Sequence, residues 1–525
     1  MMNPTQHEPT MQFATITEAL LHWAATRPDE LAFEVDGNAA TWRGLADDSR
    51  RFAAALATMG VGHGSRCALV LPTSLDLLGL IFATHLRRAA PVIVNPSLSF
   101  ETILRRVRRV GCHVVVVPDG SVDLGTSGPS GMRILTPSSL RDIDGKDLDD
   151  PAMPGPDDIA YLQLTSGTTG DPKAAVILHR NLAAYLSNGD LEFLGSDVVV
   201  SWIPPFHDLG LVLAIFAPVY FGARSHLLQP SLRSLRPWLE KIEEVRGTYT
   251  AAPDFAFRIA ARVVDPAGLD LSSMRVAFDG GEPVRASTIR EFEERFGLSR
   301  VVQPGYGLAE STLAISRCAP GDPLTEIDGH VSCGHPRKGL EVRIVDSEGC
   351  ALPAGSTGEI IARGEQIFAG YLDDEEATRE VLRDGWLHTG DLGMMDDEGR
   401  LYVLGRIRAM IKRAGTTIAP REIEEIADQI EGVRFSAAVG VPTDDGTERV
   451  IVVVEADRGA DHGNIRNKVS NAIQSSLGFP PDDVLLVAPR TIPRTGSGKI
   501  RYGELRDGVL AGSLGNAGRE RNDSA

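Results

Sequence analysis

Apolar segments alternate with segments of helical periodicity along the first part of the chain. Ile16 to Trp23 and Thr41 to Met59 repeat apolar residues at the spacing of a helix that buries one face. Further segments alternate in the same way, namely Cys67 to Leu71, Leu77 to Leu86, Pro91 to Val94, Phe100 to Val110 and His113 to Val117. This alternation predicts an α/β fold with a wound sheet. The segment Gly120 to Pro156, rich in Gly, Ser, Pro and Asp, predicts a connecting loop.

The pattern changes twice in the rest of the chain. A second α/β series runs from Val198 to Gly321, and short strands separated by turn signals between Val342 and Leu404 predict a small β region. After Gly405, helices are predicted at Glu422 to Ile430 and Ile465 to Leu477, and strands at Ala437 to Val441 and Val450 to Glu455. This order predicts a small α+β domain of about a hundred residues.

These changes predict the division of the chain. We expect residues 1–404 to form a large N-terminal domain of wound α/β subdomains plus the small β region. Residues 405–408 would be a hinge, and residues 409–510 a small, mobile α+β lid. Residues 511–525 are rich in Gly, Asn, Asp and Arg, which predicts a disordered tail.

Composition and charge exclude several classes of protein. With 525 residues and 42% apolar content, the chain can bury large cores. Its best apolar stretch, Leu211 to Ala223, contains Pro218 and Gly222 and is too short for a membrane span. A net charge of −18 argues against broad attraction to nucleic acid or anionic lipid. A phosphate-bearing substrate would therefore depend on local donors and a cation.

The N-terminal residues and the cysteines give further expectations about location and about disulfides or zinc. The first residues lack a basic region followed by an apolar one, so we expect no secretory signal and a cytoplasmic location by default. The five cysteines are odd in number and lack Cys-x-x-Cys spacing, which argues against disulfides and zinc alike. No feature of the sequence sets the oligomeric state.

One loop carries the clearest chemistry. The string Leu164-Thr-Ser-Gly-Thr-Thr-Gly-Asp-Pro-Lys173 lies between two apolar runs and combines hydroxyl donors, two glycines and a lysine. The residues expected to hold phosphate are Thr165, Ser166, Gly167, Thr168, Thr169, Gly170 and Lys173. Asp171 and Pro172 separate the second glycine from the lysine, so this is not the loop of P-loop NTPases. Taken alone, such a loop is more often a solvated hairpin turn.

The string resembles the phosphate-gripping loop of the adenylate-forming superfamily, which includes acyl-CoA synthetases, luciferase, peptide-synthetase adenylation domains and fatty acyl-AMP ligases. Further strings of that family follow in its order: Gly280-Gly-Glu-Pro283, Gly305-Tyr-Gly-Leu-Ala-Glu-Ser-Thr312, Trp386-Leu-His-Thr-Gly-Asp391, Gly405-Arg-Ile-Arg-Ala-Met-Ile-Lys412 and Pro493-Arg-Thr-Gly-Ser-Gly-Lys-Ile500. Each alone would be a turn or a solvated side chain. Together they make the resemblance specific over nearly the whole chain.

The resemblance implies roles for residues of each string. Adenine would lie against Gly280, Gly281, Glu282 and Pro283 and stack on Tyr306, which Gly307 follows. Glu310, with Thr165, would bind the Mg²⁺ that bridges the phosphates of ATP. Asp391 would accept hydrogen bonds from both ribose hydroxyls, and Arg406 would contact ribose or phosphate.

The last string supplies the catalytic lysine that the resemblance implies. Lys499 would bridge the substrate carboxylate and the α-phosphate of ATP, so that an acyl-AMP forms and pyrophosphate leaves. The lid would then turn about the hinge and open a pantetheine tunnel for the thiol that accepts the acyl group. Arg408 and Ala409 depart from the family's usual hinge residues.

The string Ser201-Trp-Ile-Pro-Pro-Phe-His-Asp-Leu-Gly-Leu211 looks like fatty acyl-AMP ligases, which pass acyl groups to the phosphopantetheine of an acyl carrier protein. His207 would lie beside the acyl carboxylate, although a histidine next to Asp208 also suits a structural pair. The extra segment that such ligases carry before the Trp386 string is missing, so CoA stays open as acceptor. An amino or aryl acid substrate, with Asp208 near its amine, is a further alternative, and a non-catalytic adenylate sensor is disfavoured. Leu211 to Phe221 suits core packing better than an acyl tunnel.

Overall fold

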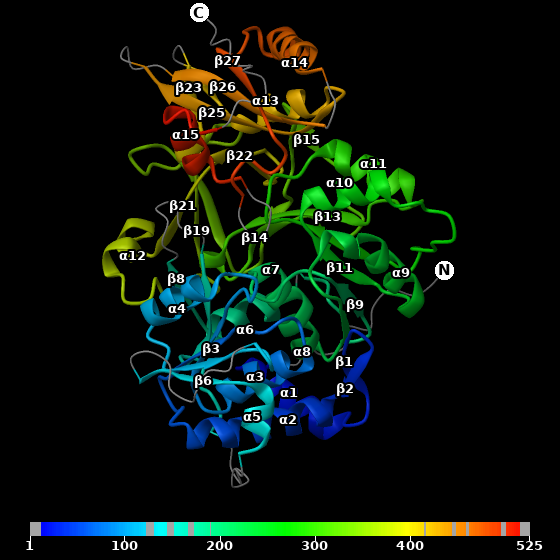
Figure 1. The fold of residues 1–525 in the computed structure, drawn as a ribbon, viewed down its shortest axis with the longest axis vertical. Coiled ribbons are helices and arrows are strands. Elements are labelled where there is room, and N and C mark those ends of the chain that lie inside the picture. Colours follow the sequence, from blue (N-terminus) through cyan, green and yellow to red (C-terminus); the bar gives the residue numbers. More distant parts are fainter. Residues whose placement is uncertain are drawn as a thin grey trace, which may run out of the picture.

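The computed structural model describes residues 12–121, 131–143, 152–165, 173–189, 191–413, 416–443, 448–457, 461–494 and 500–514. Figure 1 shows a large N-terminal body, coloured blue to yellow, with the C-terminal residues, in orange and red, above it. Within the described residues, no helix is both long and apolar enough to cross a membrane. The predicted α/β class is confirmed, because helices cover sheets that are mainly parallel.

One sheet of the body has six strands in the order β6-β5-β3-β4-β7-β8, and all neighbours are parallel except the pair β7 and β8. Its strands are β3 Arg66–Leu69, β4 Ala90–Ile93, β5 Val114–Val116, β6 Arg133–Leu135, β7 Ile159–Leu164 and β8 Ala174–Leu178. The first strands are almost wholly apolar because helices cover both faces. They match the predicted runs.

The loop predicted over Gly120 to Pro156 is wrong in part. This segment contains β6 and helix α5 Pro137–Arg141. The Thr136 side chain caps α5, and Pro137 fixes its first turn, so the helix start was marked in the sequence. The strand is only three residues long, too short for an apolar period to stand out from a loop composition.

The second sheet has nine strands in the order β17-β14-β13-β12-β11-β9-β10-β1-β2. They are β1 Leu31–Val35, β2 Asn38–Thr41, β9 Val198–Ser201, β10 Arg224–Leu227, β11 Tyr249–Ala252, β12 Val276–Asp279, β13 Val302–Gly307, β14 Ala314–Arg317 and β17 His335–Pro336. The neighbours from β1 to β13 run parallel. Parallel strands end at one edge of a sheet, and ligands of such folds bind beyond that edge.

Helices pack on these sheets around one large apolar core, which reaches from Phe13 to Leu387. They are α1 Ile16–Thr26, α2 Trp42–Thr58, α3 Leu75–His85, α4 Phe100–Arg109, α6 His179–Ser187, α7 Asp208–Leu211, α8 Ala217–Phe221, α9 Leu235–Val245, α10 Asp254–Val263 and α11 Ala286–Arg295. Side chains of Thr15, Thr41, Ser74 and Ser99 cap the first four. The segment from Leu211 to Tyr220 is buried in this core, as expected for core packing.

The predicted β region forms a five-stranded sheet. Its strands are β18 Glu341–Val345, β19 Gly358–Arg363, β20 Leu382–Arg383, β21 Trp386–Met395 and β22 Leu401–Arg406, with helix α12 Glu375–Val381 before β20. The turn from β20 to β21 consists of Asp384 and Gly385, both at positive φ, as tight hairpins require. A two-residue turn leaves no inserted segment before Trp386.

The C-terminal residues build their own layers. Strands β25 Val433–Pro442, β26 Glu448–Ala456 and β27 Asp483–Val487 form a sheet, joined by the hairpin of β23 Ile411–Arg413 and β24 Thr416–Ile418 and by helices α13 Pro420–Asp428, α14 His462–Leu477 and α15 Tyr502–Leu510. Two apolar clusters hold them together, and every residue of both lies at or after Ile411. The C-terminal residues thus have apolar cores of their own.

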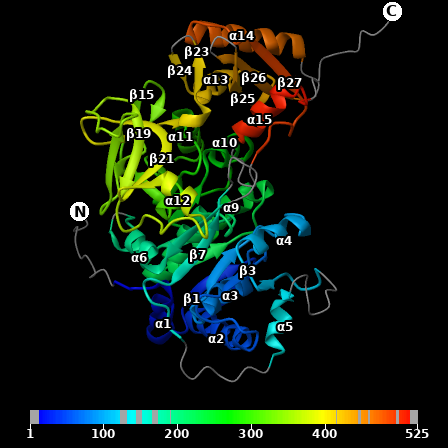
Figure 2. The ribbon, with the colours of Figure 1, turned by 90° about the vertical axis from the view of Figure 1, so that its left-hand side faces the viewer.

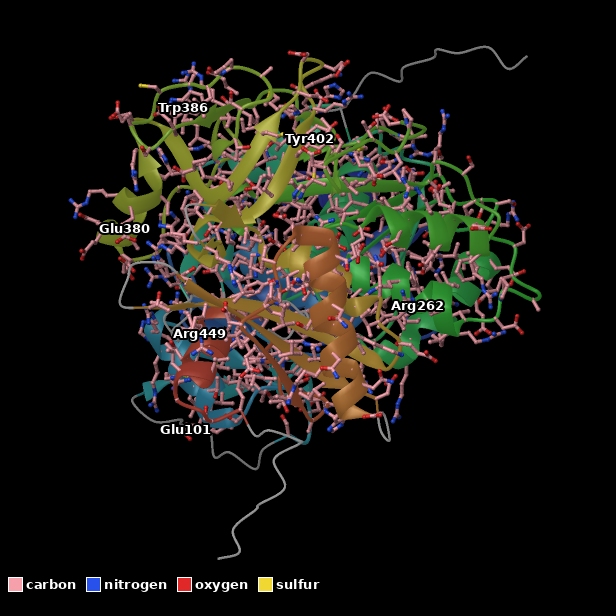
Figure 3. All side chains as sticks on the ribbon, turned by 90° about the horizontal axis from the view of Figure 1, so that it is seen from above. Glu101, Arg262, Glu380, Trp386, Tyr402 and Arg449 are labelled. Atoms are coloured by element: carbon pink, nitrogen blue, oxygen red, sulfur yellow. The ribbon has the colours of Figure 1, made fainter. Side chains whose placement is uncertain are left out.

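Figure 2 turns the molecule by a quarter and again shows the C-terminal layers stacked on one end of the body. Seen from above, they extend across the body between α12, marked by Glu380, and α10, marked by Arg262 (Figure 3). Residues 515–525, most of the predicted tail, lie outside the described residues.

Candidate active site

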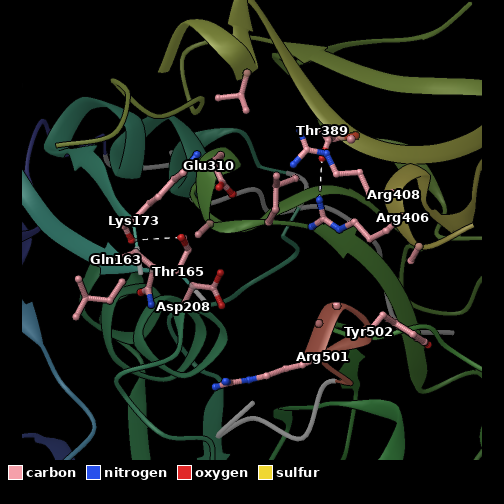
Figure 4. Close-up of a pocket in the computed structure, with 18 of the residues that line it drawn as sticks. Gln163, Thr165, Lys173, Asp208, Glu310, Thr389, Arg406, Arg408, Arg501 and Tyr502 are labelled. Carbon is pink, nitrogen blue, oxygen red and sulfur yellow. Dashed lines mark hydrogen bonds between the residues drawn. The ribbon is translucent and has the colours of Figure 1, made fainter. Parts of the chain in front are cut away.

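A cavity of about 1440 Å³ opens between the N-terminal body and the C-terminal layers. Segments far apart in the chain meet in it, as Figure 4 shows for the residues of its wall. The predicted site residues that line it are Thr165, Lys173, His207, Gly281, Gly307, Glu310 and Arg406. Ser166, Gly167, Thr168, Thr169, Gly170 and Lys499 lie outside the described residues. The motifs read from the sequence therefore converge on one space.

The base of the predicted phosphate loop is fixed by the hairpin of β7 and β8. The Thr165 backbone N–H donates to the Lys173 carbonyl oxygen at 2.8 Å, and the Thr165 hydroxyl donates to the same oxygen at 3.2 Å. The Lys173 ammonium lies 4.9 Å from the centre of the Tyr371 ring, within cation–π range. The described base of the hairpin thus brings the Thr165 hydroxyl and the Lys173 ammonium to the cavity.

Glu310 lies beside this hairpin, on the 3₁₀ turn Ala309–Ser311 that follows β13, and Figure 4 shows it near the end of the Lys173 side chain. The Tyr371 hydroxyl donates to Glu310 Oε1 at 2.5 Å, and burial together with this carboxylate raises the pKa of Tyr371. Tyr371 therefore stays a neutral hydrogen-bond donor that orients Glu310. No local signal in the sequence marked Tyr371, because its partner is 61 residues away.

The glycines of the string 305–312 have a steric reason. A Cβ at Gly307 would lie 1.8 Å from the Leu313 carbonyl oxygen, and a Cβ at Gly305 would lie 2.4 Å from the Phe278 ring. Both positions accept glycine alone because backbone and ring approach so closely. The string owes its glycines to this packing, which holds the end of β13 beside the cavity.

A buried carboxylate lies behind the cavity wall. Asp391 is 4% exposed, accepts a hydrogen bond from the Tyr306 hydroxyl at 2.5 Å and pairs with Arg406 Nε at 2.9 Å. Asp391 of β21 and Arg406 of β22 are direct partners in the sheet register, which explains the ion pair. Arg406 Nη1 also donates to the Thr389 carbonyl oxygen at 2.8 Å, the contact drawn in Figure 4. Burial and the Asp391 charge raise the pKa of Tyr306.

The string at 280–283 divides between two environments. Gly281 lines the cavity at a φ of 89°, whereas a Cβ at Gly280 would lie 2.7 Å from the Phe278 ring. Glu282 points to α10, where its Oε1 accepts the Phe255 backbone N–H at 2.5 Å, and Pro283 is exposed. Burial, with repulsion from Asp254, raises the pKa of Glu282 to about 7. The Glu282 carboxylate is thus engaged with the body and does not line the cavity.

His207 and Asp208 begin α7 at the cavity wall. His207 Nδ1 lies 2.6 Å from Asp208 Oδ1, and the Leu209 backbone N–H donates to that oxygen at 2.8 Å. The structural pair considered from the sequence is therefore present, and both side chains still face the cavity. Gln163, not identified from the sequence, donates through Nε2 to the Phe206 carbonyl oxygen at 3.1 Å and ties this segment to β7.

The C-terminal layers supply the remaining wall through the segment that follows Lys499. Ile500, Arg501 and Tyr502 line the cavity, as do Arg408 and Ala409 of the predicted hinge region. Figure 4 shows Arg501 reaching toward the side where Asp208 lies. Arg501 was not identified from the sequence, because nothing local separates it from a solvated arginine.

The oxygen donors of the cavity limit which cation it could hold. Within the part of the chain that the structure describes, no three His, Cys, Asp or Glu side chains form a group able to hold a metal ion. The Glu310 carboxylate and the Thr165 hydroxyl line the same cavity. Mg²⁺ keeps several waters and is usually held by one or two carboxylates together with substrate phosphates. The residues present fit Mg²⁺ shared with a nucleotide, and do not fit a closed protein cage.

Comparison with known proteins places this cavity in context. A family model described as AMP-binding enzyme matches residues 20–372. The chain is 31% identical to the long-chain-fatty-acid–AMP ligase FadD26 of Mycobacterium marinum, over 93% of this chain and 96% of that protein. It is 33% identical to FadD28 of Mycobacterium tuberculosis, also named a long-chain-fatty-acid–AMP ligase, over 70% of this chain and 74% of that protein.

Two solved structures of adenylate-forming proteins are similar to this chain over nearly its whole length. A structure from a study of fatty acyl-adenylate ligases from E. coli and L. pneumophila superposes with a TM-score of 0.86 at 27% identity, covering 97% of this chain and 100% of that one. The McyG A-PCP structure complexed with phenylalanyl-adenylate gives a TM-score of 0.86 at 25% identity, covering 96% and 97%.

Proposed function

The chain belongs to the AMP-binding enzyme family, and from this premise we propose that it activates a carboxylic acid with ATP as the acyl-AMP. The acid that we propose is a fatty acid, in line with the names of its relatives, and the final acceptor is the phosphopantetheine thiol of an acyl carrier protein. The observation that carries the proposal is the meeting of Thr165, Lys173, Glu310, Arg406 and the segment after Lys499 in one cavity.

The first half-reaction joins two anions. A carboxylate oxygen attacks the α-phosphorus of ATP, the bond from that phosphorus to the bridging oxygen breaks, and pyrophosphate leaves with the electron pair. Lys173 and the Thr165 hydroxyl would neutralise phosphate charge from one side, while Lys499 would contact both reacting groups. Mg²⁺ held by Glu310 would add positive charge at the phosphates. Asp391, with Arg406 beside it, would hold the ribose.

The second half-reaction needs no protein nucleophile. The thiol attacks the acyl carbonyl carbon, loses its proton to solvent or a base, and expels AMP, leaving a thioester. We propose residues 405–408 as the hinge about which residues 409–510 turn between the two steps.

CoA is the second candidate acceptor. The turn from β20 to β21 at Asp384 and Gly385 leaves α12 and Trp386 close in sequence, without the added segment that the resemblance associates with rejection of CoA. A choice between the acceptors therefore depends on direct competition.

The experiment supplies the purified protein with ATP, Mg²⁺ and a panel of fatty, amino and aryl acids, then adds CoA or holo-carrier protein. Mass spectrometry of the products identifies the acid and the acceptor. We expect acid-dependent acyl-AMP from fatty acids and an acylated carrier. Failure of every acid to yield an acyl-AMP would contradict the proposal, and a preference for amino or aryl acids would replace the proposed substrate.

A further inference from the structure

A cluster of charged side chains joins the body to helix α13 of the C-terminal layers. Arg258 of α10 and Arg285, just before α11, both approach Asp428 at the end of α13, each with a nitrogen 3.5 Å from Asp428 Oδ2. The other oxygen of Asp428 accepts the Ser436 hydroxyl at 2.8 Å. One carboxylate of the C-terminal layers thus lies between two cations of the body.

At the same interface, an arginine of the C-terminal layers contacts the body. Arg421, at the start of α13, donates through Nη2 to the Val284 carbonyl oxygen of the body at 2.5 Å and pairs with Glu425 on its own helix. Glu425 lies 3.7 Å from Arg285 Nε. The two ends of α13 therefore both contact the segment at 284–285. Figures 1 and 2 show α13 on the side of the C-terminal layers that faces α10 and α11.

The charges are poorly hydrated. The side chains of Asp428, Arg258 and Arg285 are 9%, 13% and 18% exposed. Burial, together with the positive charge of the neighbouring Arg285, lowers the pKa of Arg258. Asp254, fully buried, pairs with Arg285 at 3.2 Å. If Asp428 moved away, the two guanidinium groups would keep the body's own carboxylates, Asp254 and Glu282, and would lose the one that the C-terminal layers supply. Breaking buried ion pairs such as those of Asp428 with Arg258 and Arg285 costs far more free energy than breaking an exposed ion pair.

Helix α13 also connects this cluster to the cavity wall. On its inner side, Glu424 accepts the Tyr502 hydroxyl at 3.0 Å. Tyr502 begins α15 and lines the cavity three residues after Lys499. The position of α13 on the body therefore sets where the segment 500–507 lies. In the described arrangement that segment faces Thr165 and Glu310 across the cavity, as adenylation would require.

We propose that Arg258, Arg285 and Asp428 form an ion-pair latch that holds the C-terminal domain in the adenylation arrangement. They are positioning residues, because none of them lines the cavity. The latch rests on the proposed function for its consequence: breaking it moves residues 500–507 away from the cavity and so slows adenylation, while the second half-reaction stays intact. A coupling free energy between two sites of a protein typically changes an equilibrium constant at one of them roughly 5- to 150-fold. We therefore expect adenylation to slow about tenfold.

The test compares Asp428→Asn with Glu431→Gln. The amide keeps the shape of Asp428 and an oxygen for Ser436, whereas Glu431 is an exposed carboxylate three residues along that is absent from the latch. Adenylation is measured as acid-dependent pyrophosphate release, and transfer as AMP release from supplied acyl-AMP and thiol. We expect Asp428→Asn to slow adenylation about tenfold, with transfer unchanged or faster, and Arg258→Gln to act in the same direction. Glu431→Gln should change neither step.

Hydrogen exchange in the segment 282–286 gives a second readout that needs no catalysis. Exchange there should rise in Asp428→Asn, because α13 covers this segment less of the time. Equal loss of both half-reactions, or unchanged exchange and unchanged adenylation, would overturn the latch. A wild-type protein that makes no acyl-AMP would overturn the proposed function instead, while the exchange measurement would still decide whether the latch exists.

Discussion

Replacement of Asp391 by Asn tests the assignment of the nucleotide site most sharply. The change keeps the shape of the side chain and removes its charge. In the free protein the two oxygens contact Tyr306 and Arg406, at 2.5 and 2.9 Å. A carboxylate oxygen can accept more than one hydrogen bond, so ribose hydroxyls would donate to Asp391 in addition to these two partners.

The expected loss follows from the two hydrogen bonds. A hydrogen bond to a charged group contributes about 1.5–3 kcal/mol and a neutral one about 0.5–1.5 kcal/mol, so each bond loses about 1–1.5 kcal/mol when the charge is removed. Two bonds to the ribose then lose about 2–3 kcal/mol, which is roughly 30- to 150-fold in the dissociation constant of ATP.

The assay is calorimetric titration with ATP, 2′-deoxy-ATP and 3′-deoxy-ATP. Wild-type protein should bind each deoxy nucleotide more weakly than ATP, and Asp391→Asn should bind all three with similar affinity, since the bond that each lacks is already weakened. The matched control is Asp396→Asn. Asp396 also accepts from a tyrosine, Tyr402, at 3.0 Å and pairs with an arginine, Arg400, at 2.7 Å. Arg400 does not line the cavity, whereas Arg406, the partner of Asp391, does.

Two results would refute this reasoning. If the losses from the variant and from the deoxy nucleotides simply add, Asp391 does not contact the ribose. If Asp396→Asn weakens ATP binding as much as Asp391→Asn does, the effect comes from damage to the sheet of β21 and β22. Melting temperatures of both variants separate such damage from lost binding.

Variants at Lys499, Glu310 and Glu424 test the catalytic lysine, the Mg²⁺ ligand and a buried carboxylate. Lys499→Ala should abolish adenylation and largely spare transfer from supplied acyl-AMP; equal loss of both steps would contradict its assignment. Glu310→Gln should raise the Mg²⁺ concentration for half-maximal activity by about tenfold or more, whereas Glu376→Gln, an exposed carboxylate of the same cavity wall, should not. Burial raises the pKa of Glu424 to about 7 from its ordinary 4.5, so its contribution to stability is present below pH 4.5 and is lost as the pH rises through about 7. Glu424→Gln should therefore be more stable than wild type at pH 8, by up to about 3 kcal/mol, with little difference at pH 5 in denaturant unfolding; equal differences at both pH values would contradict this.

Local sequence patterns were sufficient to predict most helices and strands of the body. Apolar runs such as Cys67 to Leu71 are buried strands, and helix α2 ends within a residue of the predicted Met59. The hairpin of β1 and β2 was not predicted, although Asp36 and Gly37 take positive φ in its turn. Its parallel partner β10 lies far along the chain, so no local pattern reveals that it completes the large sheet.

The site could be predicted where a motif carries its own chemistry and not where partners are distant. Glu310 and Arg406, which line the cavity, could be named from the sequence because they belong to short strings of recognisable order. Tyr371 and Gln163 were not, since each acts on a neighbour that only the fold brings near. The direction of the Glu282 side chain was also beyond the sequence, because it depends on a backbone N–H of α10. The same holds for the cluster around Asp428, whose partners lie more than a hundred residues away.

The proposed reaction in this cavity forms a mixed anhydride between an organic acid and AMP. The most direct measurement incubates the protein with a fatty acid, Mg²⁺ and ATP labelled at the α-phosphate, without any thiol, and follows the label by chromatography and mass spectrometry. We expect the label in an acyl-AMP whose formation depends on the acid, with one pyrophosphate released for each acyl-AMP formed. Label that appears only in ADP, or AMP whose formation does not depend on the acid, would contradict it.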